Sequence, residues 1–529
     1  MQHKHTPSQA LTLALPVLLA VTILAALQAA EPVDLAVIHR IKAEAFDNSK
    51  VMDHIFYLTD VNGPRLTNST AFHKAADWTV DRLKSFGLSK VSKEKWGPFG
   101  KTWNYTRFSA HLLKPTYSPL IGFPMAWTPG TNGPVKGEPM LAVIKDEKDF
   151  PKFKGKLNGR IVLTDDPRTT ALLLTALGRR YSDKDLDGIE EGTVPGARRP
   201  PADREARRRL MNAKAKFLRE EGVALVITVG SKGDGGTVFA AAGGGYRAGD
   251  EVPPPMIALT PEHYNRIARL IKAKQSPEVE IDISATLDNA PADSYNIVAE
   301  LPGAAKRDEV VMIGAHFDSW HGGTGATDNA AGSAVMIEVM RILKALDLKL
   351  ARTVRIALWS GEEQGLLGSK AYVKEHFADP ADMRTTEQHA KLAGYFNYDN
   401  GSGKIRGVYL QGNDMMRPIF ADWFAPFRDL GAGRISNKDT GGTDHLSFNA
   451  VGLPGFQFIQ DPLEYSTRTH HSNMDTYDHI QETDLKQASA IIASFVYNAA
   501  TRPEMLPRKP LPKPSPAAAP SQRQPTEAQ

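Results

Sequence analysis

The sequence predicts a three-layer α/β domain, built on a mixed and mostly parallel sheet, that is interrupted by a β-rich module. From Val310 onward, apolar β-type runs alternate with helical patterns, which is typical of a sheet covered by helices on both faces. Residues 130–290 differ, because short strands there are separated by turns rich in Gly and Pro. The 529 residues are enough for roughly two to four domains.

The elements of the α/β part follow one another closely along the chain. We expect buried strands at 310–314, 353–359, 392–398, 408–411 and 456–459. We expect helices at 330–346, 365–376, 415–430 and 484–499. This order places the carboxyl ends of several strands at one edge of the sheet, where open α/β sheets form their sites.

The module at 131–290 is predicted to contain short strands and one amphipathic helix. The strands are expected at 140–144, 160–163, 224–229 and 256–259. The helix has Leu210, Ala213 and Phe217 on one face and an Arg-rich stretch at 204–209. Acidic residues are interleaved with these arginines, which favours a solvated helix face over a nucleic-acid-binding surface.

Within the module, residues 183–188 (Asp-Lys-Asp-Leu-Asp-Gly) match the first half of a calcium-binding loop. The helix-loop-helix form of that site needs a bidentate Glu at loop position twelve, and Val194 stands there. Glu190 or Glu191 would have to replace it in a different loop geometry. A solvated acidic turn is the alternative to a calcium site at 183–191.

Both ends of the chain are expected to lie outside the folded body. Residues 1–30 combine a basic start, an uncharged apolar run and small residues at the exit, as secretory signal peptides do. An uncleaved membrane anchor is the alternative, because the run is just long enough to span a bilayer. We therefore expect an exported protein, periplasmic or secreted. Residues 501–529 hold eight prolines and are expected to form a disordered tail.

Composition excludes several kinds of chemistry. The chain has no Cys, which excludes disulfides, thiolate zinc sites and a Cys nucleophile. Its 64 basic and 60 acidic residues give a net charge of +4, which is too small to favour nucleic acid as a partner. We expect no membrane contact beyond the export signal. Any metal must be held by His, Asp, Glu or backbone oxygens.

Acidic and His residues gather at or just after the predicted strand ends. These residues are His316, Asp318, Asp328, Glu362, Glu363, Asp399 and the pair His470–His471. Singly, each has a structural explanation, such as a helix N-cap at Asp328. His316 and Asp318 share one face of an extended strand, so we expect the Asp318 carboxylate to accept the free imidazole N–H. Two His and three carboxylates together supply the ligands for a pair of divalent metals.

At this point the sequence resembles the di-zinc exopeptidases with a protease-associated domain insertion. That group contains bacterial aminopeptidases, glutamate carboxypeptidase and carboxypeptidase Q. The matching motifs are His-x-Asp at 316–318, Gly-Ala-x-Asp-Asn-Ala-Ala-Gly at 325–332, Gly-Glu-Glu-x-Gly-Leu-Leu-Gly-Ser at 361–369, the later Asp399, and His-Ser-x-x-Asp-Thr at 471–476. The resemblance implies an N-terminal part of the peptidase domain at 31–130, a protease-associated domain at 131–290 and the catalytic zinc peptidase domain at 291–500.

The resemblance also implies two zinc ions per chain and a role for each residue. The implied ligands are His316 and Asp399 for one ion, Glu363 and His471 for the other, and Asp328 as the bridge between them. Glu362 is implied as the general base and Asp318 as the partner of His316. His471 is preferred over His470 because it opens the His-Ser-x-x-Asp-Thr motif. The bond between Asp328 and Asn329 is expected to be cis, as is frequent in this family.

The implied chemistry is hydrolysis of a peptide bond. Two zinc ions roughly 3.5–4 Å apart share a water molecule and lower its pKa toward about 7. Glu362 takes the proton as the water attacks the carbonyl, and then protonates the leaving amine. The expected substrates are peptides or dipeptides.

Substrate contacts are expected from Asp444, His445, Tyr465 and Arg468. If Asp444 binds a free α-amine, the enzyme is an aminopeptidase. If Arg468 pairs with a terminal carboxylate, it is a carboxypeptidase Q-like carboxypeptidase or dipeptidase. We favour the aminopeptidase. A non-catalytic binding protein and a glutaminyl-cyclase-like acyl transferase are weaker alternatives, and the oligomeric state, a homodimer included, stays open.

Overall fold

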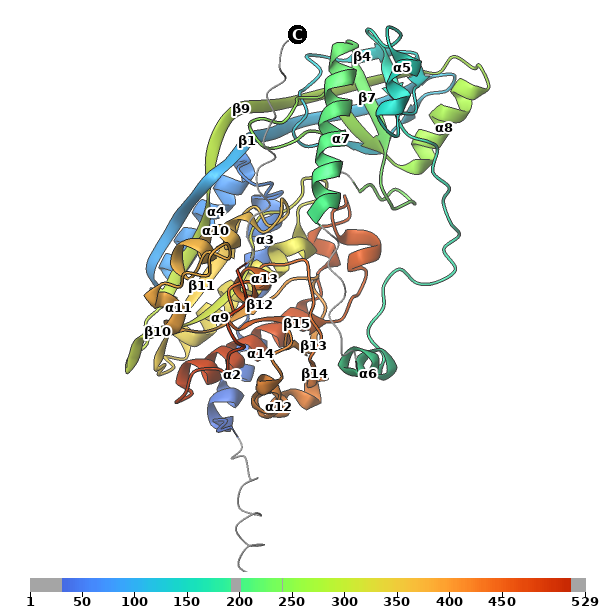
Figure 1. Cartoon of the computed structure of the whole chain (residues 1–529). Coiled ribbons are helices and arrows are strands. Elements are labelled where there is room, and N and C mark those ends of the chain that lie inside the picture. Colours follow the sequence, from blue (N-terminus) through green and yellow to red (C-terminus); the bar gives the residue numbers. More distant parts are fainter. Residues whose placement is uncertain (1–30, 192–200, 240, 515–529) are drawn as a thin grey trace, which may run out of the picture.

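A computed structural model describes residues 31–191, 201–239 and 241–514 (Figure 1). It contains a large mixed sheet and a second, five-stranded sheet. The predicted signal peptide and residues 515–529 of the Pro-rich tail lie outside the described residues. Within the described part of the chain, we find no helix that combines the length and the apolar character needed to cross a bilayer.

The large sheet has ten strands in the order β14-β13-β15-β12-β10-β11-β9-β1-β2, with β4 paired to β9. Its centre is parallel: β15 (Gly455–Gln460), β12 (Leu392–Asn397), β10 (Lys306–His316) and β11 (Arg352–Trp359). Towards one edge, β13 (Ile405–Tyr409) is antiparallel to β15 and parallel to β14 (Arg434–Ser436). The predicted α/β class is confirmed, and the predicted parallel arrangement holds for the central strands.

Two long antiparallel strands, β1 (Ser89–Lys114) and β9 (Glu278–Leu301), connect the two sheets (Figure 1). One end of β9 pairs with β11, and its other end pairs with β4 (Val135–Gly137). Leu112, Val279 and Ile281 of this ribbon pack in one core with residues of the second sheet. Neither strand was predicted from the sequence, and β9 runs across the predicted boundary at 290.

The second sheet has the order β3-β8-β7-β6-β5 and belongs to the inserted module. Its strands are β3 (Gly122–Pro124), β8 (Met256–Leu259), β7 (Leu225–Val229), β6 (Ile161–Leu163) and β5 (Pro139–Leu141). Strand β2 (Ser118–Pro119), which belongs to the large sheet, precedes β3 in the sequence. The helices are α5 (Phe150–Phe153), α6 (Asp183–Glu191), α7 (Pro201–Glu220) and α8 (Pro261–Lys272). Four of these strands lie within the segments predicted from sequence or overlap them. The resemblance to a protease-associated domain stays a prediction.

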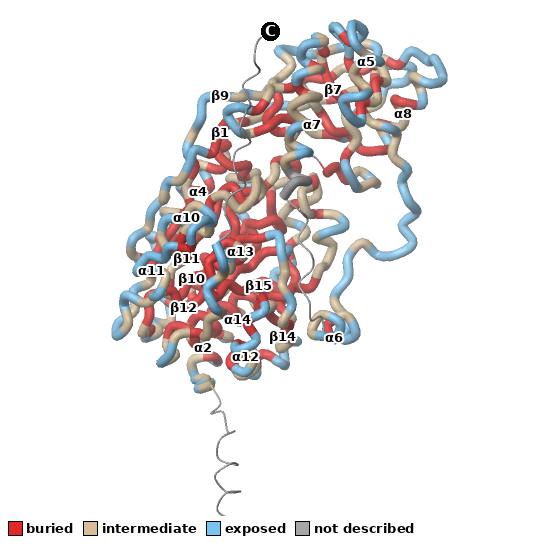
Figure 2. Tube along the Cα trace, in the orientation of Figure 1, coloured by how far each residue is buried: buried red, intermediate tan, exposed pale blue. Residues whose placement is uncertain are grey.

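Helices cover both faces of the large sheet, and strand alternation explains how. Val311 and Ile313 of β10 face a core shared with α9 (Ala331–Ala345), whereas Met312 faces a core shared with α10 (Leu367–His376). Other helices of this domain are α2 (Leu35–Asp47), α3 (Val51–Phe56), α4 (Thr70–Ser85), α11 (Glu387–Lys391), α12 (Arg417–Phe424), α13 (His445–Asn449) and α14 (Glu482–Thr501). Figure 2 shows these buried layers in red around the central strands. The central strands that lead to the site are therefore buried between helices on both faces.

Residues 183–191 form helix α6 and neither an acidic turn nor a calcium loop. Arg434 of β14 contacts the carboxylates of Asp187 at 2.7 Å and Glu190 at 2.8 Å. Helical spacing brings these two carboxylates to one face, where the guanidinium binds them both. The acidic pattern therefore docks α6 onto β14.

The predicted disorder from residue 501 is wrong for the first part of the tail. Leu506 is 2% exposed and packs in the main core of the α/β domain. The Arg508 guanidinium donates to the carbonyl oxygens of His389 at 2.9 Å and Ala390 at 3.2 Å. An extended segment can be ordered when side chains anchor it, and composition alone does not reveal those anchors.

Candidate metal centre

The predicted site residues meet at the carboxyl edge of the parallel strands. His316 is the last residue of β10, Glu362 and Glu363 follow β11, and Asp399 follows β12. They line a cavity of about 480 Å³. Its lining residues are His316, Asp328, Glu362, Glu363, Gln364, Gly365, Leu366, Asp399, Asn400, Gly441, Gly442, Leu446, Tyr465, His470 and His471. Parallel pairing brings these strand ends together, as the sequence analysis expected.

His316 presents one ring nitrogen to two carboxylates. Its Nε2 lies 3.2 Å from Asp328 Oδ1 and 3.6 Å from Asp399 Oδ1. Its Nδ1 donates to the backbone carbonyl of Asp318 at 2.9 Å, whereas the Asp318 carboxylate is 3.9 Å away. The expected bond to that carboxylate is therefore wrong. The chain turns after β10, so the carbonyl of residue 318 orients the imidazole and fixes Nε2 as the outward atom.

The Asp318 carboxylate instead holds the turn that carries Glu362 and Glu363. It accepts the backbone N–H of Glu362 at 3.2 Å and that of Glu363 at 3.4 Å. The hydroxyl of Thr67 also lies 2.9 Å from Asp318 Oδ2. Asp318 is fully buried, so these donors replace the water that a charged carboxylate would otherwise bind.

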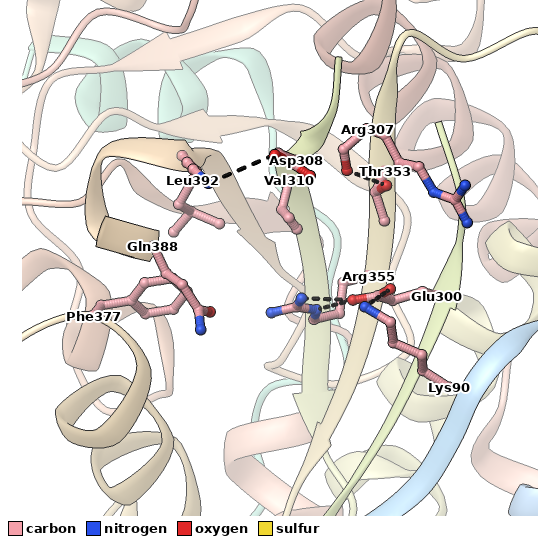
Figure 3. Close-up of a pocket in the computed structure, with 11 residues that line it drawn as sticks. Lys90, Glu300, Arg307, Asp308, Val310, Thr353, Arg355, Phe377, Gln388 and Leu392 are labelled. Atoms are coloured by element: carbon pink, nitrogen blue, oxygen red, sulfur yellow. Dashed lines mark hydrogen bonds and ion pairs between the residues drawn. The ribbon is translucent and has the colours of Figure 1, made fainter. Parts of the chain in front are cut away.

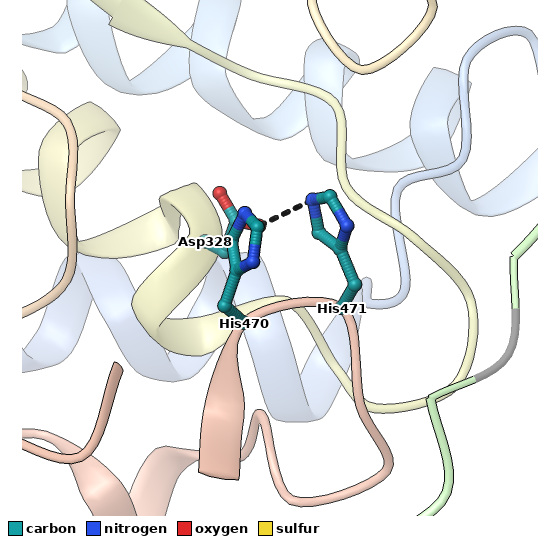
Figure 4. A group of neighbouring side chains, drawn as sticks. All are labelled: Asp328, His470 and His471. Carbon is teal, nitrogen blue, oxygen red and sulfur yellow. Dashed lines mark ion pairs between the residues drawn. The ribbon is translucent and has the colours of Figure 1, made fainter. Parts of the chain in front are cut away.

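Figure 4 shows the His471 imidazole paired with the Asp328 carboxylate. Its Nε2 lies 3.2 Å from Asp328 Oδ2 and 2.9 Å from Glu363 Oε2. The neighbouring His470 stacks on it, with ring centroids 3.6 Å apart, and its own Nε2 is 3.8 Å from Asp328. His471 has φ of 64°, a left-handed conformation that costs an L-residue about 1–2 kcal/mol. Its loop must therefore be held by other contacts.

Asp328 lies between the imidazoles of His316 and His471 because the backbone around it is fixed. The Asp328–Asn329 bond is cis, as expected. The buried Asp475 carboxylate accepts the N–H groups of Thr327 at 2.5 Å and Asp328 at 3.2 Å. Arg65, which is fully buried, donates to the carbonyls of Phe317 and Gly325 at 2.8 Å each.

Arg65, Thr67 and Asp475 have roles in the site that were not predicted from the sequence. Asp475 was visible only as part of the His-Ser-x-x-Asp-Thr motif, and its contact with the 327–328 backbone depends on folding. Arg65 and Thr67 precede the catalytic strands by about 250 positions, and no local pattern marks them. A role for such residues becomes visible only in the folded chain.

The carboxylates are crowded in a buried space. Burial and the nearby Asp328 raise the pKa of Glu363 to about 7, and burial also raises the pKa of Asp444 to about 7. Burial, with Asp444 and Asp399 adding repulsion, raises the pKa of Glu362 well above its usual range. Burial opposes the charge of His471, but Glu363 and Asp328 outweigh it and raise its pKa to about 10. Bound cations would stabilise the ionised carboxylates.

The donor set fits divalent metal ions. Asp328 Oδ2, Glu363 Oε1 and Asp399 Oδ1 are buried without a hydrogen-bond partner among the described residues, and buried oxygens in proteins rarely stay so. Two overlapping groups, His316–Asp328–Asp399 and Asp328–His470–His471, have ligand atoms within 4.8 Å of one another. Imidazole and carboxylate ligands around a shared Asp suit zinc.

Only one of the four predicted substrate contacts lines the cavity. Tyr465 does so. Asp444 and His445 are fully buried at the start of α13, where His445 Nε2 lies 3.1 Å from the Thr440 carbonyl. The Arg468 guanidinium faces Glu464, 3.7 Å away. The cavity wall is built by residues that the sequence analysis did not single out, among them Leu366 and Leu446.

A second cavity of about 250 Å³ adjoins β9, β10 and β11 (Figure 3), and none of its described lining residues lines the metal centre. Most of its charged groups pair with one another. Arg355 and Lys90 both contact Glu300, at 2.5 and 3.0 Å, and Lys391 lies 3.7 Å from Asp308. None of the described residues that line it is His, so it is a poor candidate for a zinc site.

Comparisons with known proteins agree with this geometry. Residues 296–496 match the model of peptidase family M28. These residues form a peptidase family M28 domain. Carboxypeptidase Q from Rattus norvegicus is 26% identical over 454 residues, which cover 85% of each chain. Aminopeptidase YwaD from Bacillus subtilis is 26% identical over 259 residues, covering 48% of this chain and 53% of that protein.

Solved structures extend the similarity beyond residues 296–496 to most of the chain. A peptidase M28 precursor from Shewanella amazonensis superposes with a TM-score of 0.63 at 26% identity, covering 90% of this chain and 98% of that one. BSAP, a zinc aminopeptidase from Bacillus subtilis, has a TM-score of 0.53 at 20% identity, covering 85% and 94%, and shows the fold alone. The predicted family and the predicted class, a metallo-exopeptidase hydrolase, are confirmed.

Proposed function

We propose that the chain is an exported, zinc-dependent aminopeptidase that releases N-terminal residues from peptides. The observation that carries this proposal is the charge of the cavity. Four of its described lining residues are carboxylates and none is Lys or Arg. A terminal carboxylate is usually bound by a guanidinium or ammonium group, whereas a free α-amine needs carboxylate partners. Because all four carboxylates are assigned below to zinc or to the base, what favours the amino end is that the described lining offers no Lys or Arg to a terminal carboxylate.

The proposed metal ligands are His316, Asp399, Glu363, His471 and the bridging Asp328. Two zinc ions held by them would act as Lewis acids that polarise the scissile carbonyl and acidify water. The carbonyl of Asp318 keeps the His316 ring in place, and its carboxylate keeps Glu362 and Glu363 in place. The ligand set is thus positioned before substrate arrives.

Glu362 is the proposed general base. It lies at the cavity wall beside Glu363, and its side chain is buried. Burial raises its pKa, which strengthens its tendency to take a proton from the attacking water. The same carboxyl then delivers that proton to the leaving amine. The apolar side chains of Leu366 and Leu446 offer a surface for a substrate side chain.

A second candidate is a carboxypeptidase or dipeptidase. It is favoured by the similarity to carboxypeptidase Q, which extends over 85% of the chain, whereas the similarity to aminopeptidase YwaD covers 48%. The two activities require different free ends on the substrate. They can therefore be distinguished with blocked peptides.

The experiment compares hydrolysis of leucine anilide with that of N-blocked and C-blocked dipeptides by the zinc-loaded protein. An aminopeptidase cleaves the anilide and the C-blocked dipeptide, and N-blocking stops it. If only C-blocking stops cleavage, the aminopeptidase proposal is wrong and the carboxypeptidase is correct. Metal analysis of the same sample tests the binding-protein alternative, since near-zero zinc per chain after gentle purification would favour it.

Export is the part of the proposal that rests on residues 1–30. Their basic start, apolar run and small-residue exit support a signal peptide. N-terminal sequencing of the protein recovered from the periplasm or medium should find a chain that begins near Glu31. Recovery of the intact chain from the cytoplasm would contradict export.

A further inference from the structure

The loop that carries His471 is attached to the inserted module on both sides of the two histidines. We call residues 461–475 the ligand loop and residues 164–182, which lead from β6 to α6, the strap. The strap leaves the module and crosses to the α/β domain (Figure 1). It contacts the beginning of the ligand loop, and a second module segment contacts its end.

The first attachment is centred on Asp461, which is fully buried. Its carboxylate accepts from Arg180 of the strap at 3.0 Å and from the backbone N–H of Tyr181 at 3.0 Å. Arg406 of β13 is a further donor at 3.1 Å. Arg180 also contacts Asp484 of α14 at 2.7 Å, so one guanidinium joins the strap, the ligand loop and α14.

The strap continues along the ligand loop beyond Asp461. The backbone N–H of Arg179 donates to the carbonyl of Leu463 at 3.0 Å, and the hydroxyl of Thr467 donates to the carbonyl of Leu177 at 2.7 Å. Between these contacts lies Tyr465, which lines the cavity. The strap therefore supports the segment that leads directly to His470 and His471.

The second attachment is Asn473, two residues after His471. Its side-chain oxygen accepts the N–H of Val238 at 2.8 Å, and its amide group donates to the carbonyl of Gly236 at 3.1 Å. Its backbone N–H donates to the carbonyl of Val238 at 3.2 Å. Gly236 and Val238 belong to the module, which thus holds the loop on the far side of the histidines.

We propose that the inserted module positions the metal ligand His471, through Arg180 on one side of it and Asn473 on the other. The left-handed backbone of His471 supports this, because a disfavoured conformation persists only where the surroundings impose it. Arg180 and Asn473 touch neither the proposed metal ligands nor the cavity, so both are positioning residues. The inference rests on the proposed function, since it takes His471 as a zinc ligand.

The test replaces Arg180 by Ala and uses Arg179→Ala as the matched control. Both variants lose one positive charge from the strap. The Arg179 side chain is exposed and contacts Asp185 within the module, whereas its attachment to Leu463 is made by backbone. Arg406 still pairs with Asp461 in Arg180→Ala, so that carboxylate keeps a partner. Asn473→Ala is the second variant, with the exposed Ser466→Ala as its control.

Zinc retention is measured by dialysis against a graded chelator, together with kcat, KM and the unfolding of the zinc-free proteins. We expect Arg180→Ala and Asn473→Ala to hold one zinc as the wild type does and the second at least tenfold more weakly. Their kcat should fall and should recover in excess zinc, which a merely structural defect would not allow. The controls should match the wild type.

If both variants retain two zinc ions with wild-type affinity, the inference is wrong and the proposed function stands. If the wild type itself binds no zinc, the proposed function fails. Should Arg180→Ala not fold, the comparison of Asn473→Ala with Ser466→Ala decides the question alone.

Discussion

The carboxylate of Asp318 accepts the backbone N–H of Glu362 at 3.2 Å, and this bond joins the end of β10 to the turn after β11. The second carboxylate oxygen accepts the N–H of Glu363. The proposed base and a proposed metal ligand are thus placed by one buried side chain. Its importance follows from these two backbone contacts, because its carboxylate lies 3.9 Å from His316 Nδ1, which is beyond hydrogen-bond distance.

Asp318→Asn should lower kcat by about 10–100-fold. An amide has one acceptor oxygen where the carboxylate has two, so one N–H of the turn loses its partner and the turn shifts. Thr67→Val removes only the hydroxyl that contacts the same carboxylate and should have a smaller effect. Steady-state kinetics and zinc content decide the matter, and wild-type kcat in Asp318→Asn would contradict it.

Glu362→Gln should abolish turnover and leave the zinc content close to that of the wild type. The amide keeps the size of the side chain but cannot take a proton from water. Glu362 is not among the proposed ligands, whereas the adjacent Glu363→Gln should reduce zinc content as well. Kinetics and metal analysis of the two variants separate a base from a ligand. Full activity in Glu362→Gln would disprove the assignment.

The sequence was enough to predict five of the ten strands of the large sheet, because buried parallel strands are continuous apolar runs and their helices have clear periodicity. It also identified the residues that meet at the site, since these follow strand ends directly. The long ribbon β1–β9 was missed. β1 contains Gly and Pro and has no continuous apolar run. Residues 279–287 of β9 do alternate between apolar and polar side chains, and this strand signal was overlooked.

The direction of side chains could not be predicted from spacing alone. His316 and Asp318 are two residues apart, which suggested a bond between their side chains, but the chain leaves the strand at His316 and the Asp318 carboxylate faces the Glu362 turn. The contacts of Arg65, Arg180 and Asn473 join segments that are distant in sequence. Composition and periodicity do not encode such pairs.

His321→Gln should make the stability of the protein less sensitive to acid. His321 is buried, and burial lowers its pKa to about 4 from the ordinary 6.5. As the pH falls below 6.5, the unfolded chain binds a proton that the folded chain refuses until about pH 4. Stability is therefore lost over this window, by about 3 kcal/mol at most.

Urea unfolding at several pH values between 7 and 4 measures this loss. In His321→Gln the decrease in the free energy of unfolding across the window should be smaller than in the wild type. The exposed His39→Gln serves as the control and should behave as the wild type. An identical pH dependence in His321→Gln and the wild type would show that His321 is not the group responsible.

Leu506→Ala should destabilise the α/β domain, although Leu506 lies in a segment whose composition suggests disorder. Its side chain is 2% exposed, and a Cβ built at Gly394 of β12 would lie 2.9 Å from its Cδ1, so it packs directly on the central sheet. Truncating a buried Leu typically costs about 2–5 kcal/mol. Leu511→Ala, five residues later and 48% exposed, should change stability by about 0.5 kcal/mol or less. Urea unfolding of the zinc-loaded proteins measures both, and equal stability of Leu506→Ala and Leu511→Ala would show that the tail is not anchored through Leu506.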